Sequence, residues 1–148
     1  MQKNDVAYDF TLLDQDGNER TLSKLLVDGP VVLFFFPAAM SPACTQESCH
    51  FRDLKGEFDA LGAQLVGVSM DSADRQARFA QKNHFDYPLL ADVDGEVARR
   101  YGVKRALNLL KVKRATFVIA QDLTVRDVIT SEVSMNAHAD RALAALRS

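Results

Sequence analysis

The sequence predicts an α/β domain in which a central mixed β-sheet is flanked by helices and preceded by an N-terminal β-hairpin. Segments typical of strands alternate with segments typical of helices, which is the pattern of a sheet covered by helices. The most apolar stretch, residues 31–36, has no polar–apolar alternation and predicts a central strand buried on both faces. Two later strands predict a second hairpin. The 148 residues fit one domain over 1–148.

The first elements are the N-terminal hairpin and a short helix. Residues 8–13 and 19–22 have strand character, and the turn-forming residues 14–18 lie between them. Ser23 could cap a short helix over 23–27, which Gly29 and Pro30 would end.

The middle of the chain predicts two strand–helix units. Residues 31–36 are followed by Pro37, a loop, and a helix over 42–61 with Pro42 in its first turn, where proline is favourable. Residues 64–69 predict a second buried strand, and Asp71 or Ser72 could cap a helix that runs to about Asn83. A short strand over 88–91 and a helix over 95–101 follow.

The C-terminal part predicts the second hairpin and a last helix. Residues 116–120 and 124–130 predict strands joined by a tight turn at 121–122. The last helix is expected over 136–146, with Ala139, Leu143 and Leu146 on one face.

Composition and charge exclude several classes of partner. Hydrophobic residues make up 47%, charged residues 26%, and the formal net charge is -2, which argues against nucleic acid or an anionic membrane as the main partner. The longest apolar run has the length of a strand, and the polar first residues lead into no apolar core of signal-peptide length. We therefore expect a cytoplasmic protein.

The two cysteines, Cys44 and Cys49, are the most informative residues. The segment that carries them follows the most apolar strand, at the strand end where such sheets usually place active sites. Cys44 falls in the first turn of the next helix, where free backbone N–H groups and the helix dipole favour a thiolate. Cys49 lies deeper in the helix and lacks that help, so Cys44 is the better nucleophile.

The spacing of the cysteines restricts how they can pair. Residues five apart on an ideal helix are separated by ~8.7 Å between Cα atoms. Disulfides rarely exceed roughly 6.8 Å between Cα atoms. A Cys44–Cys49 disulfide therefore requires at least one helical turn to unwind, and would be strained and easily reduced.

Simpler interpretations of the cysteines stay open at this point. Cys49 alone could be a small buried apolar residue. A metal site would need His50 as an additional ligand, and the four-ligand spacing of structural zinc is absent. The CxxC spacing of disulfide reductases is also absent.

Pro37, Ser41 and Cys44 are spaced as a proline, three residues, a hydroxyl residue, two residues and a cysteine. This spacing resembles the active-site motif of the peroxiredoxins. Ser41 stands where many members have threonine, but it keeps the hydroxyl, so we expect the chemistry to survive. Ala43 and Ala38 stand where many members have glycine and lysine.

The residues after Cys44 resemble one branch of this family in particular. Thr45, Glu47 and Cys49 are similar to the Thr-x-Glu-x-Cys of the peroxiredoxin Q (bacterioferritin comigratory protein) branch, whose resolving cysteine lies five residues on. The likeness extends along nearly the whole chain. Further similar segments are Asp9-Phe10-Thr11-Leu12, Asp14-Gln15-Asp16-Gly17, Phe51-Arg52-Asp53, Tyr87-Pro88-Leu89-Leu90 and Arg114-Ala115-Thr116-Phe117-Val118-Ile119.

The resemblance implies a thioredoxin-like fold and the reduction of hydrogen peroxide and organic hydroperoxides. Cys44 would attack the peroxide and become a sulfenic acid, and Cys49 would resolve it as an intramolecular disulfide. Thioredoxin or a similar thiol donor would regenerate the enzyme, without a metal or other cofactor.

The resemblance also assigns roles, each beside a simpler alternative. Ser41 would donate a hydrogen bond to the thiolate or the peroxide, cap the helix, or do both. Arg114 would place a positive charge beside Cys44, although an arginine at a strand end is ordinarily a surface charge. Glu47 would orient Arg114, or lie exposed in the first helical turn. Pro37 would shape and shield the pocket, or only end the strand. No role is assigned to His50, His84 or His138.

Two other functions are compatible with the cysteine pair. A protein thiol–disulfide oxidoreductase would exchange disulfides rapidly without peroxide, and the missing CxxC argues against it. A redox sensor would use the Cys44–Cys49 pair to switch helix shape, and would oxidise slowly and without turnover. Both cysteines lie in one chain, and there is no separate C-terminal resolving cysteine. This removes one reason to require a dimer, and we expect a monomer.

Overall fold

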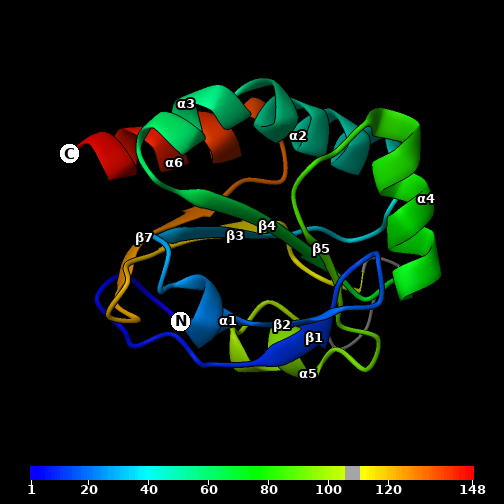
Figure 1. The fold of residues 1–148 in the computed structure, drawn as a ribbon, viewed down its shortest axis with the longest axis horizontal. Helices are drawn as coiled ribbons and strands as arrows, with labels where there is room; N and C mark the ends of the chain where they lie inside the picture. Colours follow the sequence, from blue (N-terminus) through cyan, green and yellow to red (C-terminus); the bar gives the residue numbers. More distant parts are fainter. Residues whose placement is uncertain (106–110) are drawn as a thin grey trace.

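The computed structural model describes residues 1–105 and 111–148, which form a mixed sheet with helices on both faces (Figure 1). The strands are β1 (Thr11–Leu13), β2 (Glu19–Thr21), β3 (Val31–Phe35), β4 (Gln64–Ser69), β5 (Leu89–Ala91), β6 (Ala115–Ile119) and β7 (Val125–Thr130). The helices are α1 (Leu22–Leu25), α2 (Pro42–Asp53), α3 (Lys55–Ala60), α4 (Ala73–Asn83), α5 (Glu96–Arg100) and α6 (Asn136–Arg147). The predicted fold class is confirmed, including the N-terminal hairpin of β1 and β2.

The sheet is built around β3, with the strand order β2-β1-β5-β4-β3-β6-β7. β3 pairs in parallel with β4 and antiparallel with β6, and all its residues are buried. This agrees with the absence of alternation in its sequence, since a strand covered on both faces has no solvent-facing side.

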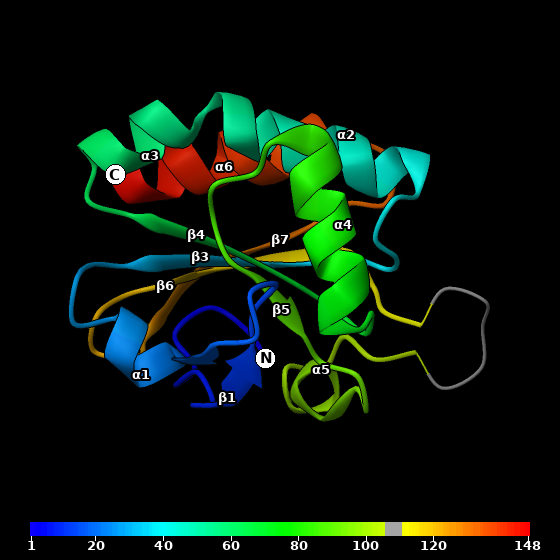
Figure 2. The same ribbon diagram turned by 45° about the vertical axis from the view of Figure 1, so that its right-hand side comes forward.

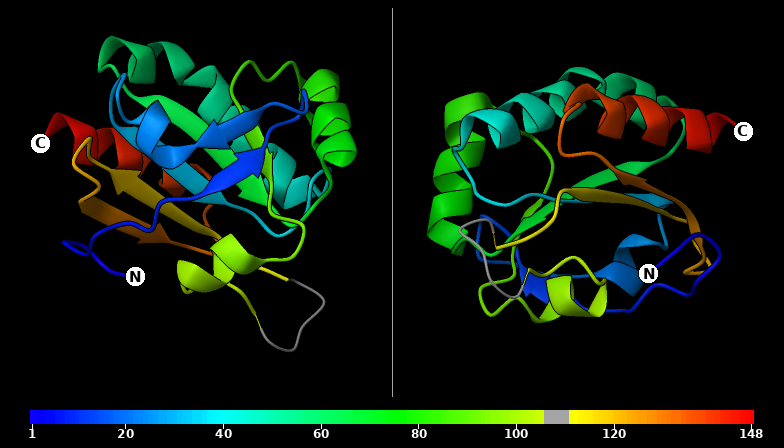
Figure 3. Two further views of the ribbon diagram at one scale, coloured as in Figure 1. Left: turned by 60° about the horizontal axis from the view of Figure 1, so that its bottom comes forward. Right: turned by 180° about the vertical axis from the view of Figure 1, so that it is seen from behind.

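Helices lie on both faces of the sheet (Figures 1 and 2). On each face, side chains of the strands and helices pack into one apolar cluster. Phe34 and Phe36 point into the cluster that packs under α2, α4 and α6. Phe35 points to the opposite face, into the cluster that includes α1 and α5. Figure 3 (left) turns the face that carries α1 and α5 toward the reader, and Figure 3 (right) shows the helices on the two sides of the sheet from behind. Within the described residues, every helix is too short or too polar to cross a lipid bilayer.

The single helix expected over 42–61 is wrong, because the chain bends at Leu54. α2 ends at Asp53 and α3 begins at Lys55, with Leu54 at φ -96° and ψ 5° between them. The bend lets Phe58 of α3 pack against Phe51 of α2, with ring centroids 5.9 Å apart, and both rings are fully buried. Burial of these two aromatic side chains outweighs the continuity of the helix.

Ser23 is not the helix cap that the sequence predicted. α1 begins one residue earlier, at Leu22, and Thr21 is its N-cap. The backbone N–H of Ser23 is instead bonded to Asp9 Oδ1 at 2.8 Å. A carboxylate from a segment outside the helix therefore satisfies a free N–H group of its first turn.

The pairing of β3 and β6 brings two distant segments to one edge of the sheet. Phe35, at the end of β3, faces Ala115, at the start of β6. Figure 2 shows the start of α2 and the start of β6 at this same edge. The residue before β6 therefore meets the helix that follows β3.

Candidate active site

Cys44 lies in the first turn of α2, directly after the loop that leaves β3. Ser41 is the N-cap residue, and its Oγ accepts a hydrogen bond from the Cys44 N–H at 3.4 Å. The Cys44 side chain is fully buried. This places the sulfur in the first turn of the helix, where the helix dipole favours a negative charge.

Arg114 supplies a cation at the sulfur. Its Nη2 lies 3.3 Å from Cys44 Sγ, and its Nη1 donates to Glu47 Oε1 at 3.0 Å. The Arg114 side chain is only 5% exposed. The planar guanidinium thus contacts two acidic groups on the same face of α2, the Cys44 thiol and the Glu47 carboxyl.

Glu47 is buried beneath Arg114 and is not exposed to solvent. Burial raises the pKa of Glu47 to about 8, while the charge of Arg114 acts in the opposite direction. Glu47 Oε2 has no hydrogen-bond partner among the described residues. One guanidinium serves both Cys44 and Glu47, so it does not fully compensate the buried carboxylate.

His138 of α6 completes this buried group and was missed by the sequence interpretation. Its Nε2 lies 3.5 Å from Glu47 Oε2 and 2.9 Å from the Ser131 carbonyl oxygen. Its Nδ1 is 2.8 Å from Thr116 Oγ1. Burial, with the nearby charge of Arg114, lowers the pKa of His138. The position next to Ala139, on the apolar face of the last helix, was the available signal that this histidine is buried.

The Ser41 hydroxyl proton is directed away from the sulfur in this structure. Ser41 Oγ donates to the Ala38 carbonyl oxygen at 3.0 Å while it accepts from the Cys44 N–H. A hydroxyl has one proton, so donation to a peroxide requires the hydroxyl to turn away from Ala38. Pro37 is buried at the start of the same loop.

Asp71 and Arg75 hold the middle of this loop. Asp71 Oδ2 accepts from the Ala39 N–H at 2.7 Å, and Arg75 Nη2 donates to the Ala39 carbonyl oxygen at 3.3 Å. Asp71 and Arg75 also pair with each other at 3.0 Å. Met40, the next residue, has a φ of 68°, which is unfavourable for a residue with a side chain. The sequence suggested only a capping role for Asp71, and Ser72 takes that role instead.

Cys49 lies on α2 beyond Glu47 and is half-buried. Its Sγ faces Asn83 Oδ1, at the end of α4, at 3.8 Å. Both cysteines are free thiols. The intact helix keeps the two sulfurs apart, as the spacing predicted.

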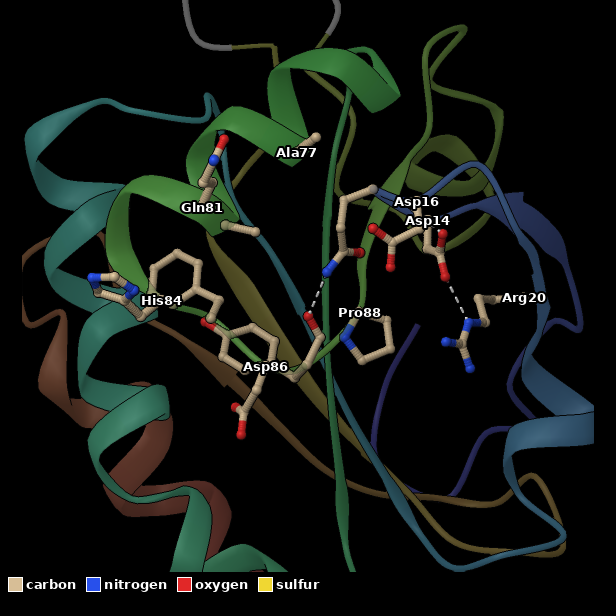
Figure 4. Close-up of a pocket in the computed structure, with 12 residues that line it drawn as sticks. Asp14, Asp16, Arg20, Ala77, Gln81, His84, Asp86 and Pro88 are labelled. Carbon is tan, nitrogen blue, oxygen red and sulfur yellow. Dashed lines mark hydrogen bonds and ion pairs between the residues drawn. The ribbon is translucent and has the colours of Figure 1, made fainter.

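The described residues suggest no metal site, because no three metal-ligating side chains gather within 1–105 and 111–148. A hollow of about 540 Å³ lies between α4 and the β1–β2 turn, away from Cys44 (Figure 4). Two of its charged side chains are already paired: Arg20 Nε donates to Asp14 Oδ2 at 2.8 Å. Gln15 also bridges two backbone groups of the Tyr87–Leu89 segment at its wall.

Comparison with known proteins identifies the family. Residues 4–128 match the AhpC/TSA family. A protein of Mycobacterium tuberculosis named as a peroxiredoxin is 58% identical over 150 residues, covering 100% of this chain and 97% of the relative. The chain belongs to the peroxiredoxins of the AhpC/TSA family.

Solved structures of peroxiredoxins share this thioredoxin-like fold. Peroxidoxin BcpB of M. tuberculosis superimposes with a TM-score of 0.96 at 58% identity, covering 99% of this chain and 97% of that one. The bacterioferritin comigratory protein of Xanthomonas campestris, studied for its alkyl peroxide reduction activity, gives a TM-score of 0.85 at 31% identity, covering 93% of this chain and 90% of that one. As a peroxiredoxin, the chain is a peroxidase, an enzyme of the oxidoreductase class.

The buried Glu47 of this peroxiredoxin predicts a pH dependence of stability. The pKa of Glu47 is about 8 in the folded protein, against an ordinary value of 4.5, so its contribution to stability is fully present below pH 4.5. That contribution is lost as the pH rises through the folded value. We expect the unfolding free energy of the wild type to fall relative to Glu47→Gln between pH ~5 and ~8, by at most roughly 1.4 kcal/mol per pH unit.

Urea unfolding of both proteins across this pH range measures the difference. Glu57→Gln is the matched control, because Glu57 is an exposed glutamate paired with Arg147 on the surface. Its unfolding free energy should differ from that of the wild type by a nearly constant amount. A constant difference for Glu47→Gln as well would show that Glu47 is ionised at every pH tested.

Proposed function

We propose that this peroxiredoxin reduces hydrogen peroxide and organic hydroperoxides through Cys44, is resolved by Cys49, and is recycled by thioredoxin or a similar thiol donor. The observation that carries the proposal is the contact of the Arg114 guanidinium with the Cys44 sulfur, 3.3 Å away in a buried site. A thiolate is the reactive form of cysteine, and a fixed cation stabilises it.

In the first step the Cys44 thiolate attacks one oxygen of the peroxide. The S–O bond forms as the O–O bond breaks, and Cys44 becomes a sulfenic acid. The departing oxygen takes up a proton and leaves as water or as an alcohol. Negative charge moves from sulfur to this oxygen, and Arg114 is positioned to stabilise it at both ends. Glu47 holds the guanidinium through its 3.0 Å contact.

The loop before α2 would form the wall of the peroxide pocket. Pro37 shields the sulfur from one side, and Ser41 donates its hydroxyl proton to the peroxide once it turns from the Ala38 carbonyl. Asp71 and Arg75 keep this loop in place through the backbone of Ala39.

In the second step Cys49 attacks the Cys44 sulfenic acid. The Cys49 thiol gives up its proton, the S–S bond forms, and the hydroxyl of the sulfenic acid leaves as water. α2 must unwind between the two residues before the sulfurs can meet. A dithiol donor such as thioredoxin then reduces the disulfide in exchange for its own oxidation.

The substrate class is supported by relatives. The bacterioferritin comigratory protein of X. campestris is described as having alkyl peroxide reduction activity. We extend this class to the present chain, together with hydrogen peroxide. Recycling by thioredoxin agrees with a cytoplasmic location and with a monomer that carries both thiols.

A Cys49→Ser variant tests the resolving step. We expect it to consume one equivalent of peroxide per chain in the presence of thioredoxin and then to stall, while the wild type turns over. The stalled protein should carry a sulfenic acid on Cys44, detectable by a dimedone adduct in mass spectrometry. Turnover of Cys49→Ser at the wild-type rate would show that Cys49 is not the resolving thiol.

A further inference from the structure

Tyr87 reaches from the segment before β5 to the part of α2 that lies between the cysteines. Its hydroxyl donates to the Ser48 carbonyl oxygen at 2.8 Å, one residue before Cys49. The side chain is 2% exposed. Burial raises the pKa of Tyr87 well above its usual value, so the hydroxyl keeps its proton and stays a donor.

The tyrosine ring is fixed by packing that does not depend on its hydroxyl. It stacks on Phe85, with ring centroids 5.3 Å apart, and meets the edge of Phe34 at 5.8 Å. A rigid ring presents its hydroxyl at low cost in conformational entropy. The hydrogen bond to Ser48 is therefore a preformed contact between the resolving segment and the sheet.

The same segment also contains an unfavourable feature. Ser48 Oγ is buried and has no hydrogen-bond partner among the described residues. A buried polar atom without a partner destabilises the folded helix, and unwinding returns it to water. The hydrogen bond from Tyr87 therefore opposes unwinding of α2, whereas the unpaired Ser48 hydroxyl favours it.

Two contacts hold the end of α2, after Cys49, in place while the segment between the cysteines unwinds. Arg52 Nη1 donates to the Asn83 carbonyl oxygen at 2.7 Å, and His50 Nε2 is 2.8 Å from Asp140 Oδ1. These contacts anchor the end of α2 after the cysteine pair. The Ser48 carbonyl belongs to the peptide bond that joins Ser48 to Cys49, which must turn if Cys49 is to approach Cys44.

We propose that the Tyr87–Ser48 hydrogen bond is a latch that limits how fast α2 unwinds, and so sets the fate of the Cys44 sulfenic acid. This proposal rests on the function proposed for Cys44 and Cys49. With the latch open, Cys49 attacks the sulfenic acid, and the disulfide and one water form. With the latch closed, a second peroxide oxidises the sulfenic acid to a sulfinic acid and is itself reduced to water or alcohol. Tyr87 is a positioning residue and does not contact the reacting atoms.

A Tyr87→Phe variant removes the latch and keeps the ring. We expect disulfide formation to be about 2- to 10-fold faster, the effect of losing one hydrogen bond to a backbone carbonyl. The fraction of Cys44 converted to sulfinic acid at high peroxide should fall by a similar factor. The rate of the first oxidation of Cys44 should not change, because Tyr87 contacts neither Cys44 nor Arg114.

Tyr101→Phe is the matched control. Tyr101 is equally buried, and its hydroxyl donates to the Tyr8 carbonyl oxygen at 2.7 Å on the opposite face of the sheet. It loses the same kind of hydrogen bond without touching α2, so its resolution rate should equal that of the wild type. Rapid mixing with peroxide, followed by acid quench, thiol blocking and mass spectrometry, counts sulfenic acid, disulfide and sulfinic acid over time.

Amide hydrogen exchange gives an independent measurement on the reduced proteins. The amides of residues 46–50 should exchange faster in Tyr87→Phe than in the wild type. In Tyr101→Phe they should exchange at the wild-type rate. Resolution at the wild-type rate in Tyr87→Phe, with a Cys44–Cys49 disulfide still formed, would overturn the latch and leave the proposed function intact. Failure of the wild type to form that disulfide would instead overturn the proposed function.

Discussion

A Cys44→Ser variant is expected to lose peroxide reduction completely, by roughly 10⁴-fold or more. Cys44 is the sulfur that Arg114 contacts, and a serine hydroxyl in its place neither ionises readily nor accepts an oxygen atom from a peroxide. Serine is close in size to cysteine, so the N-cap of α2 and the buried packing should be preserved. Peroxide consumption coupled to thioredoxin and NADPH oxidation measures the loss.

The control for this variant is Cys49→Ser, in which the same substitution is made five residues further along the same helix. It should still complete the first oxidation of Cys44 at the wild-type rate. If Cys44→Ser reduced peroxide as fast as the wild type, Cys44 would not be the nucleophile. The proposal that Arg114 stabilises the reacting sulfur would then be wrong as well.

An Arg114→Lys variant is expected to slow the oxidation of Cys44 by about 10²- to 10³-fold. A lysine ammonium is a point charge, and it cannot contact Cys44 and Glu47 together as the planar guanidinium does. The stabilisation of charge on both sulfur and departing oxygen would be reduced. Stopped-flow measurement in a Cys49→Ser background isolates this step from resolution and recycling.

Arg20→Lys is the matched control for the arginine substitution. Arg20 also pairs with a buried carboxylate, Asp14, at 2.8 Å, but in the N-terminal hairpin and away from Cys44. It should leave the rate of Cys44 oxidation unchanged. If Arg114→Lys is too unstable to measure, Arg114→Gln combined with Glu47→Gln avoids leaving a buried Glu47 without its arginine partner and permits the same measurement. Oxidation at the wild-type rate in either protein would contradict a catalytic role for Arg114.

The strands were largely predictable from the sequence, because long apolar runs without alternation specify burial on both faces. Residues 64–69 were expected as a strand and form β4 with those bounds. The helix expected from about Asp71 or Ser72 to Asn83 is α4, with Ser72 as its cap. The bend at Leu54 was not predictable, since it depends on where Phe58 finds the core.

Some residues of the candidate site were predictable from the sequence, and others were not. Cys44 was identifiable because its position follows from local sequence alone: a buried strand, a loop, a serine cap and a first helical turn. The sequence left open whether Glu47 is exposed or oriented toward Arg114, and the structure buries it in contact with that arginine. His138 was assigned no role, because nothing in its own helix shows that it approaches Glu47.

The sequence by itself determined the fold class, the two cysteines, and the helix start that favours a thiolate at one of them. These are local properties, set by residues within one or two turns of each other. Only the tertiary structure decided that Arg114 meets Cys44 across 70 residues of chain and that Glu47 and His138 lie buried in contact with each other. It also decided that the Tyr87 hydroxyl is bonded to the Ser48 carbonyl oxygen, between the cysteines. Strand pairing and the burial of aromatic side chains make those contacts, and neither can be read from the spacing of residues along the chain.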